Sequence, residues 1–336
     1  MNNRKKMLTG LVAVLVIATS VCMVVLSNKS EANQNEKKNF KVVAYYPYWK
    51  GNQLRKLQFN KVTHVNYAFA IPTREGNLRK LEQEELAKQL IKEAHKQKVK
   101  VLLSVGGWSY NDAELEPVFK EATNTEKKRA KLAKSIINMC NKYGFDGIDM
   151  DWEHPRTDTT KNQYEAFMLY LGKKLHSQDK LFTAAILGGV NQLGAAYYDS
   201  KAQTDKVLNE LDWINVMAYD GGDGRYHSPY SYAKKCGNYW KKKRGVPAGK
   251  IVLGVPFYGR PTWATYEELL EADKNAYKSD TATFNGTKVY YNGVNTIKKK
   301  TNYALDNFGG VMIWEITQDS SNGKYSLLNA IYSCLK

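Results

Sequence analysis

The chain has 336 residues, of which 43% are hydrophobic, and carries a formal net charge of +17. This length suits two average domains or one large α/β barrel, with enough apolar residues for a sizeable core. Basic residues are dispersed or lie on predicted helix faces, as at 241–244 and 298–300. The charge therefore favours a solvated basic surface facing anionic cell-wall polymers over a specific nucleic-acid site.

The N-terminus is typical of an export signal. Three basic residues, 4–6, precede the uncharged run 8–26. Its 19 residues also approach the length that spans a bilayer, so membrane attachment through 8–26 is the alternative. A small-x-small site at 30–32 favours cleavage and a secreted protein over one anchored to the outer face of the plasma membrane. The predicted division is a signal peptide or signal anchor at 1–32, a polar linker at 33–39 and a catalytic domain at 40–336.

Eight short apolar runs follow, rich in Val, Ile, Tyr and Phe, and each predicts a strand buried on both faces. They lie at 41–46, 61–70, 99–104, 144–151, 181–187, 212–219, 251–257 and 309–314. Apolar residues at three- and four-residue steps predict helices at 82–97, 125–142, 162–176 and 326–335. Strands that alternate with helices predict an α/β fold, a parallel (β/α)8 TIM barrel forming one catalytic domain.

The fourth strand ends in a row of acids. If 144–151 is a strand, Asp149, Asp151 and Glu153 share one face, while Ile148 and Met150 face the opposite side. Like charges at about 7 Å spacing cannot all ionise freely, so at least one pKa should rise. A protonated carboxyl beside an ionised one suits acid-catalysed cleavage of a glycosidic bond. An acidic loop or a divalent-metal site is the alternative, and the apolar alternation disfavours both.

The other predicted strand ends carry polar and aromatic residues that would meet at the same rim of the barrel. Any one aromatic alone is more often a core residue, but six together suggest flat platforms for sugar rings. The rim residues are Tyr45, Phe69, Ser104, Gly107, Trp108, Met217, Tyr219, Asp220, Tyr258, Arg260 and Trp314.

Cysteine and histidine spacings argue against disulfides and metal sites. Beyond the leader, Cys140, Cys236 and Cys334 are odd in number, widely spaced and lack a CxxC pair, so buried free thiols are expected. The five histidines have no metal-ligand spacing, and no phosphate loop or dinucleotide fingerprint occurs. We expect neither a metal nor a cofactor.

The acid row and the strand ends resemble glycoside hydrolase family 18, the chitinase family. Residues 146–153 match its DxxDxDxE signature, and 104–107 match its SxGG element. The likeness continues through 217–220, 258–260 and Trp314, and so covers the chain from about Val42 to the C-terminus.

This resemblance implies a substrate-assisted retaining mechanism. Glu153 would be the general acid and later the base toward water, and Asp151 would orient the 2-acetamido group that attacks C1. Asp149 would share a proton with Asp151, and Tyr219 would bond the acetamido oxygen. The other rim residues would bind substrate, with Trp314 and Trp108 stacking on sugars. The expected partner is chitin or another N-acetylglucosamine-containing oligosaccharide, bound by a monomer without nucleic acid.

The chain departs from the family in two places. His154 stands where many chitinases have Tyr, and only 48 residues separate Arg260 from Gly309, where deep-cleft chitinases insert a subdomain. A short helix at 266–274 and an extended piece at 288–291 are predicted there, so we expect an open cleft and cleavage within chains. An enzyme acting on the chitobiose core of N-glycans, one cutting peptidoglycan, and a non-catalytic sugar-binding lectin remain alternatives.

Overall fold

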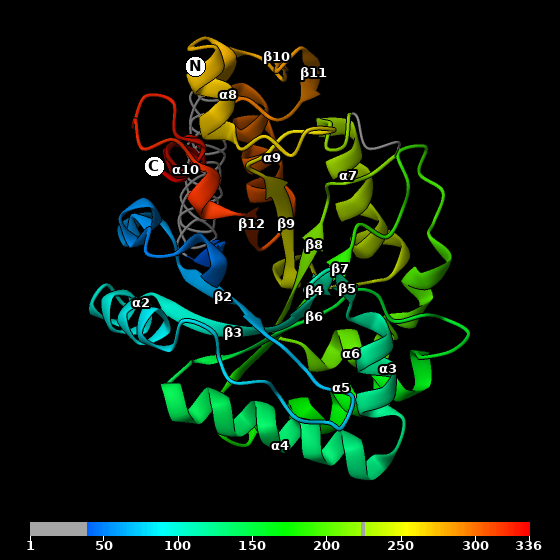
Figure 1. The fold of residues 1–336 in the computed structure, drawn as a ribbon. Helices are drawn as coiled ribbons and strands as arrows, with labels where there is room; N and C mark the ends of the chain where they lie inside the picture. The colour runs from blue at the N-terminus through cyan, green and yellow to red at the C-terminus, as the bar shows by residue number, and fades with distance from the viewer. Residues whose placement is uncertain (1–38, 223–225) are drawn as a thin grey trace, which may run out of the picture. The chain divides into compact units, whose positions relative to one another are not determined.

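The structure, a computed structural model, describes residues 39–222 and 226–336 (Figure 1). Eight parallel strands close a barrel in which first and last strands pair, β1 beside β12. The predicted (β/α)8 barrel is therefore confirmed. In chain order the strands are β1 (Lys41–Pro47), β2 (His64–Ala70), β3 (Lys100–Gly107), β6 (Gly147–Trp152), β7 (Leu181–Leu187), β8 (Trp213–Met217), β9 (Ile251–Pro256) and β12 (Gly310–Trp314).

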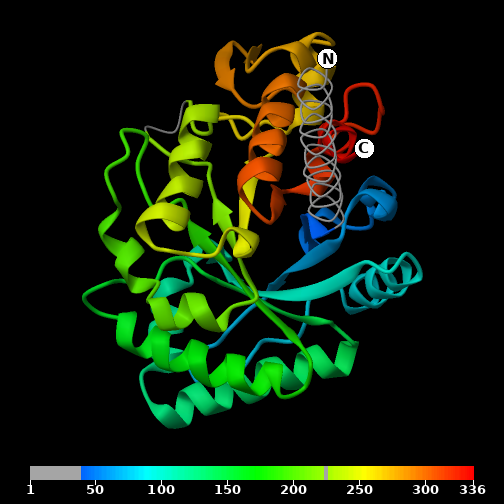
Figure 2. The same ribbon diagram turned by 180° about the vertical axis from the view of Figure 1, so that it is seen from behind.

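Helices surround these strands on the outside, as the two opposite views show (Figures 1 and 2). Four of them were expected from periodicity, and the structure places their ends within two residues of the expected ones. The nine α-helices among the described residues are α2 (Glu84–Lys96), α3 (Glu116–Thr123), α4 (Glu126–Tyr143), α5 (Lys161–His176), α6 (Asp205–Glu210), α7 (Tyr230–Asn238), α8 (Tyr266–Ala272), α9 (Val294–Asn307) and α10 (Leu327–Leu335).

Helix α4 shows how local sequence sets an element. Its N-cap, Thr125, accepts a hydrogen bond from the backbone of Lys128, and Gly144 ends it with a φ of 79°. A capping hydroxyl satisfies a free N–H, and glycine takes positive φ without a Cβ clash. The buried stripe is Leu132, Ala133, Ile136, Cys140 and Tyr143. The chain then re-enters the barrel as β6, which carries the acids.

The connection after β9 is short, as expected. Helix α8 begins at a capping box in which Thr265 and Glu268 bond each other's backbone. An antiparallel hairpin follows, β10 (Thr281–Phe284) with β11 (Thr287–Tyr290). The sequence had predicted the helix and the second strand but not β10. A backbone bridge between Arg260 and Tyr290 ties the hairpin to the end of β9.

Two further expectations concern the cysteines and the leader. Cys140 and Cys236 are fully buried thiols outside any disulfide, while Cys334 is partly buried. Within residues 39–222 and 226–336, no helix combines the length and apolar character needed to cross a bilayer. The predicted signal or anchor at 1–32, with its run at 8–26, lies outside the described residues.

Candidate active site

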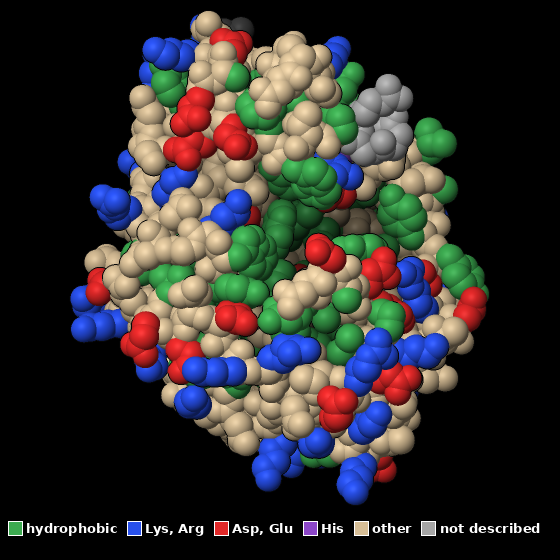
Figure 3. Space-filling view, viewed as in Figure 1, with side chains coloured by type: hydrophobic (Ala, Val, Ile, Leu, Met, Phe, Trp, Pro, Cys, Tyr) green, Lys and Arg blue, Asp and Glu red, His purple; other side chains and the backbone are tan. Residues whose placement is uncertain are grey.

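A cleft of about 810 Å³ opens at the C-terminal ends of the barrel strands. Figure 3 shows it as a hollow bordered by hydrophobic side chains. Most of the predicted site residues, from the rim and the acid row, line it: Tyr45, Phe69, Trp108, Asp151, Glu153, Met217, Tyr219, Asp220, Arg260 and Trp314. Asp149, Ser104, Gly107 and Tyr258 are not in its lining. Two of them bond lining residues directly: Asp149 accepts from Tyr45, and Tyr258 donates to Asp220.

Asp149 lies inside the barrel below the cleft and accepts four hydrogen bonds. Its Oδ2 accepts from the Tyr45 hydroxyl at 2.6 Å and from Ser104 Oγ at 2.9 Å. Its Oδ1 accepts from Thr183 Oγ1 at 2.6 Å and from Asn215 Nδ2 at 3.0 Å. Burial raises the pKa of Asp149, and these donors oppose the rise because they stabilise the charged form. Strands β1, β3, β7 and β8 are thus each bonded to one carboxyl of β6.

Asp151 and Glu153 lie above Asp149 at the cleft floor. Asp151 is 3% exposed, and its Oδ1 is buried without a hydrogen-bond partner. Burial, followed by the charges of Glu153 and Asp149, holds the pKa of Asp151 well above its usual range. Burial and then the charge of Asp220 raise the pKa of Glu153 to about 7. Glu153 can therefore hold a proton near neutral pH, which a general acid needs.

The proton sharing expected between Asp149 and Asp151 stays a prediction. Asp149 already accepts four hydrogen bonds, and Asp151 lies two residues further along the same strand, β6. Asp146, before β6, lies away from this group. It accepts bonds from His95, Lys100 and the backbone of Val101 and joins the start of β6 to β3.

Asp220 forms the opposite wall and is held by three neighbours. Its Oδ2 accepts from the Tyr258 hydroxyl at 2.6 Å, while Arg260 Nε and His227 Nδ1 both lie 3.3 Å from Oδ1. Burial raises the pKa of Asp220, but the bonds from His227 and Tyr258 outweigh it and lower the pKa overall. Asp220 therefore carries the negative charge that helps keep Glu153 protonated.

Two glycines let the backbone of β3 pass close to this floor. A Cβ on Gly106 would lie 2.3 Å from the Asp151 carbonyl oxygen, and one on Gly107 would lie 2.6 Å from the Phe69 ring. Both have positive φ, 116° and 92°, which side chains other than glycine rarely adopt. Glycine at both positions therefore permits this close approach.

A family model described as glycosyl hydrolases family 18 matches residues 41–319. The chain belongs to this family. The structure is similar to that of a family 18 chitinase from Flavobacterium johnsoniae, with 30% identity, a TM-score of 0.75, and coverage of 88% of this chain and 94% of that one. A chitinase-like effector of Moniliophthora roreri is 32% identical over 64% of this chain and 57% of its own. Chitinase 63 of Streptomyces plicatus is 29% identical over 71% and 46%, so the chain spans about half of these curated relatives.

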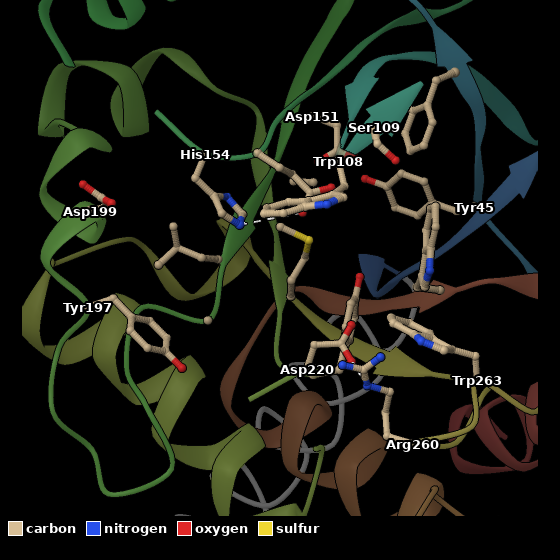
Figure 4. A pocket seen from close by; sticks show the side chains of 18 of the residues that line it. Tyr45, Trp108, Ser109, Asp151, His154, Tyr197, Asp199, Asp220, Arg260 and Trp263 are labelled. Carbon is tan, nitrogen blue, oxygen red and sulfur yellow. Dashed lines mark ion pairs between the residues drawn. The ribbon is translucent and has the colours of Figure 1, made fainter. Parts of the chain in front are cut away.

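Aromatic rings border the cleft, as expected for a family 18 protein. Trp314 stacks on Phe69 with centroids 5.8 Å apart and meets Tyr45 edge-on at 5.4 Å. Trp108 is half exposed and lies beside His154 (Figure 4). The rings near Trp314 form a rigid floor, whereas Trp108 offers a free face to a ligand.

Two exposed tryptophans in the cleft were missed by the sequence analysis. Trp49 comes two residues after the end of β1 and lies beside Phe69. Its position just after a predicted strand is the signal that could have found it. Trp263 lies in the connection after β9, where no periodicity pointed to it. Its ring stacks on Tyr258 at 5.4 Å, and the Arg260 guanidinium lies 3.7 Å from its centre (Figure 4).

His154, which departs from the tyrosine common in the family, points into the cleft beside the acid. Its Nε2 lies 3.7 Å from Glu153 Oε2 (Figure 4). Burial, followed by the charge of Arg156, lowers the pKa of His154 to about 4, against the opposing charge of Asp199. The imidazole is therefore neutral near pH 7. Arg156 itself pairs with Asp199 at 3.1 Å on the same side of the cleft.

Proposed function

We propose that the protein is an exported chitinase that hydrolyses β-1,4 bonds between N-acetylglucosamine units by a substrate-assisted, retaining mechanism. The observation that carries this proposal is the pairing of Glu153, whose pKa is about 7, with Asp151, whose Oδ1 is buried and without a partner. A buried acceptor without a donor is costly, and an amide N–H of an N-acetyl group would satisfy it. Membership of family 18 supports the same reaction.

The chemistry follows from these two carboxyls. Glu153 gives its proton to the glycosidic oxygen as the bond to C1 breaks, and the acetamido oxygen attacks C1 to form an oxazolinium ring. Asp151 accepts a hydrogen bond from the amide N–H and compensates the positive charge that develops on the nitrogen. Water then attacks C1, which opens the ring. The water passes a proton to Glu153, which restores the acid. Two inversions at C1 give a product that retains the β configuration.

The wall of the cleft supports cleavage within chains. The connection after β9 contains only α8 and the β10–β11 hairpin before α9, instead of a large subdomain. Trp49, Trp108 and Trp263 are each at least half exposed along the cleft, so a polymer can settle onto them from the side. The basic leader with its apolar run supports export to where such polymers occur.

The deciding experiment compares the purified domain on chitin oligosaccharides, peptidoglycan and a high-mannose glycopeptide. We expect cleavage of the chitin oligosaccharides, with a β-anomeric product seen by NMR before mutarotation, and none of fully deacetylated chitosan. Glu153→Gln should bind oligosaccharide but lose about three or more orders of magnitude in turnover.

Each other outcome has a distinct meaning. If products formed only from peptidoglycan or only from the glycopeptide, that polymer would be the substrate instead of chitin. The roles of Glu153 and Asp151 would be unchanged. Binding without turnover by the wild type would identify a lectin. Efficient cleavage of deacetylated chitosan would contradict substrate assistance. Release of disaccharide from the outset, with no early fall in the viscosity of a soluble chitin derivative, would contradict internal cleavage.

A further inference from the structure

Lys300, on the inner face of α9, is a fully buried lysine whose hydrogens are all donated to uncharged oxygens. Its Nζ lies 2.7 Å from the backbone oxygen of Ser228, 2.7 Å from Ser228 Oγ and 2.5 Å from Asn292 Oδ1. Lysine is rarely buried, because removing an ammonium from water is costly unless each hydrogen finds an acceptor. In its ammonium form Lys300 has three donors in one compact group for the three acceptors here, which a methionine or glutamine could not supply. Burial lowers the pKa of Lys300 to about 7, and the charge of Asp280 opposes this.

Ser228 links Lys300 by hydrogen bonds to the backbone just after β8. Its hydroxyl donates to the backbone oxygen of Ala218 at 2.7 Å while it accepts from Lys300. Asn292 Nδ2 donates to the Ser228 backbone oxygen at 2.9 Å. Ser228 and Asn292 are each 2% exposed, so no solvent competes for these bonds. The oxygen that is held belongs to the residue directly before Tyr219 and Asp220.

The same short chain of contacts reaches the side chain of Asp220. His227, next to Ser228, is 1% exposed, and its Nδ1 lies 3.3 Å from the Asp220 backbone nitrogen and 3.3 Å from Asp220 Oδ1. The backbone of Gly221 also bonds the His227 carbonyl at 3.1 Å. A displacement of Ser228 would therefore move both the main chain and the partner of Asp220.

We infer that Lys300 is a positioning residue that fixes Tyr219 and Asp220 in the cleft through Ser228. The inference rests on the proposed function, because only in a working glycosidase does the place of these two side chains limit the rate. Burial raises the pKa of Glu153 and the charge of Asp220 adds to the rise, so a shift of Asp220 also changes the pH at which the acid loses its proton. This pH readout separates positioning from a contribution to folding alone.

The test compares Lys300→Met, Lys300→Gln, Ser228→Ala and the double variant with a matched control, Lys299→Met, at the exposed neighbour on the same helix. Lys300→Met should lower kcat roughly 10- to 100-fold, with a smaller change in KM. The basic limb of its kcat/KM profile should move to lower pH. Ser228→Ala should act in the same direction, and the double variant should lose less than the product of the single losses. Lys299→Met should match the wild type.

Folded Lys300→Met or Lys300→Gln with wild-type kcat and an unmoved basic limb, but a lower melting temperature, would overturn the inference. If neither Lys300 variant folds, Ser228→Ala with an unchanged limb overturns it. Amide hydrogen exchange at residues 218–221 provides a readout without substrate, and it should speed up in both Lys300→Met and Ser228→Ala but not in Lys299→Met. Unchanged exchange in these variants refutes the inference, whether or not the wild type is active. A wild type that cleaves none of the substrates refutes the proposed function instead.

Discussion

Thr183→Val is a sharp test of how the barrel holds the acid row. The variant keeps the shape of a fully buried side chain and deletes the hydroxyl that donates to Asp149 Oδ1 at 2.6 Å. A hydrogen bond to a charged group contributes about 1.5–3 kcal/mol, so the free energy of unfolding should fall by about 2 kcal/mol when Asp149 is ionised. Asn215 would remain on the same oxygen at 3.0 Å.

The loss should depend on pH. The hydroxyl favours the carboxylate form, so deleting it raises the pKa of Asp149 above its already elevated value. In the variant, the folded state therefore keeps Asp149 protonated over a wider pH range above the pKa of Asp149 in the unfolded chain. Within that range the free energy of unfolding falls as pH rises. The deficit of Thr183→Val relative to wild type should therefore be larger at about pH 8 than at about pH 5.

Urea unfolding followed by tryptophan fluorescence at both pH values measures this difference. Thr301→Val is the matched control, since Thr301 is equally buried but its hydroxyl donates to the backbone oxygen of Ile297 at 2.9 Å. Its loss should be about 1 kcal/mol or less and independent of pH. Equal losses for the two variants at both pH values would refute the view that Thr183 stabilises an ionised Asp149.

Three further predictions concern the cleft. Asp220→Asn removes the charge that assists burial in raising the pKa of Glu153, so the basic limb of kcat/KM, expected near pH 7, should move to lower pH; an unmoved limb would contradict that coupling. His154→Phe should leave the pH dependence above about pH 5 unchanged, because the pKa of His154 is about 4, and a lost acid limb nearer neutrality would show that the imidazole titrates there. Trp108→Ala should raise KM for chitin oligosaccharides roughly 2- to 12-fold with less effect on kcat, from the loss of one stacked ring; steady-state kinetics showing an unchanged KM would remove Trp108 from substrate binding.

The barrel and its acid row are determined largely by local sequence. Strands buried on both faces appear as short apolar runs, and the alternation around Asp149 and Asp151 assigns them to one face of β6. Helices α3, α6, α7 and α9 were not predicted, and neither was β10, whose place depends on its pairing with β11. Apart from the 14-residue α9, these segments have nine residues or fewer. Such short segments have weak intrinsic preferences, and packing against the strands decides them.

Tertiary structure decided which of the predicted site residues meet a ligand. Tyr45 and Asp149 both lie at or near strand ends in sequence, yet only Tyr45 reaches the cleft lining while Asp149 is enclosed by four donors. His227 and Lys300 carry no local signal, because their importance arises from Asp220 and Ser228, which lie on other segments. Periodicity reports only which face of a strand or helix a side chain occupies. Burial, charge and hydrogen bonding between distant segments exist only once the barrel has closed, and these set the pKa of Glu153.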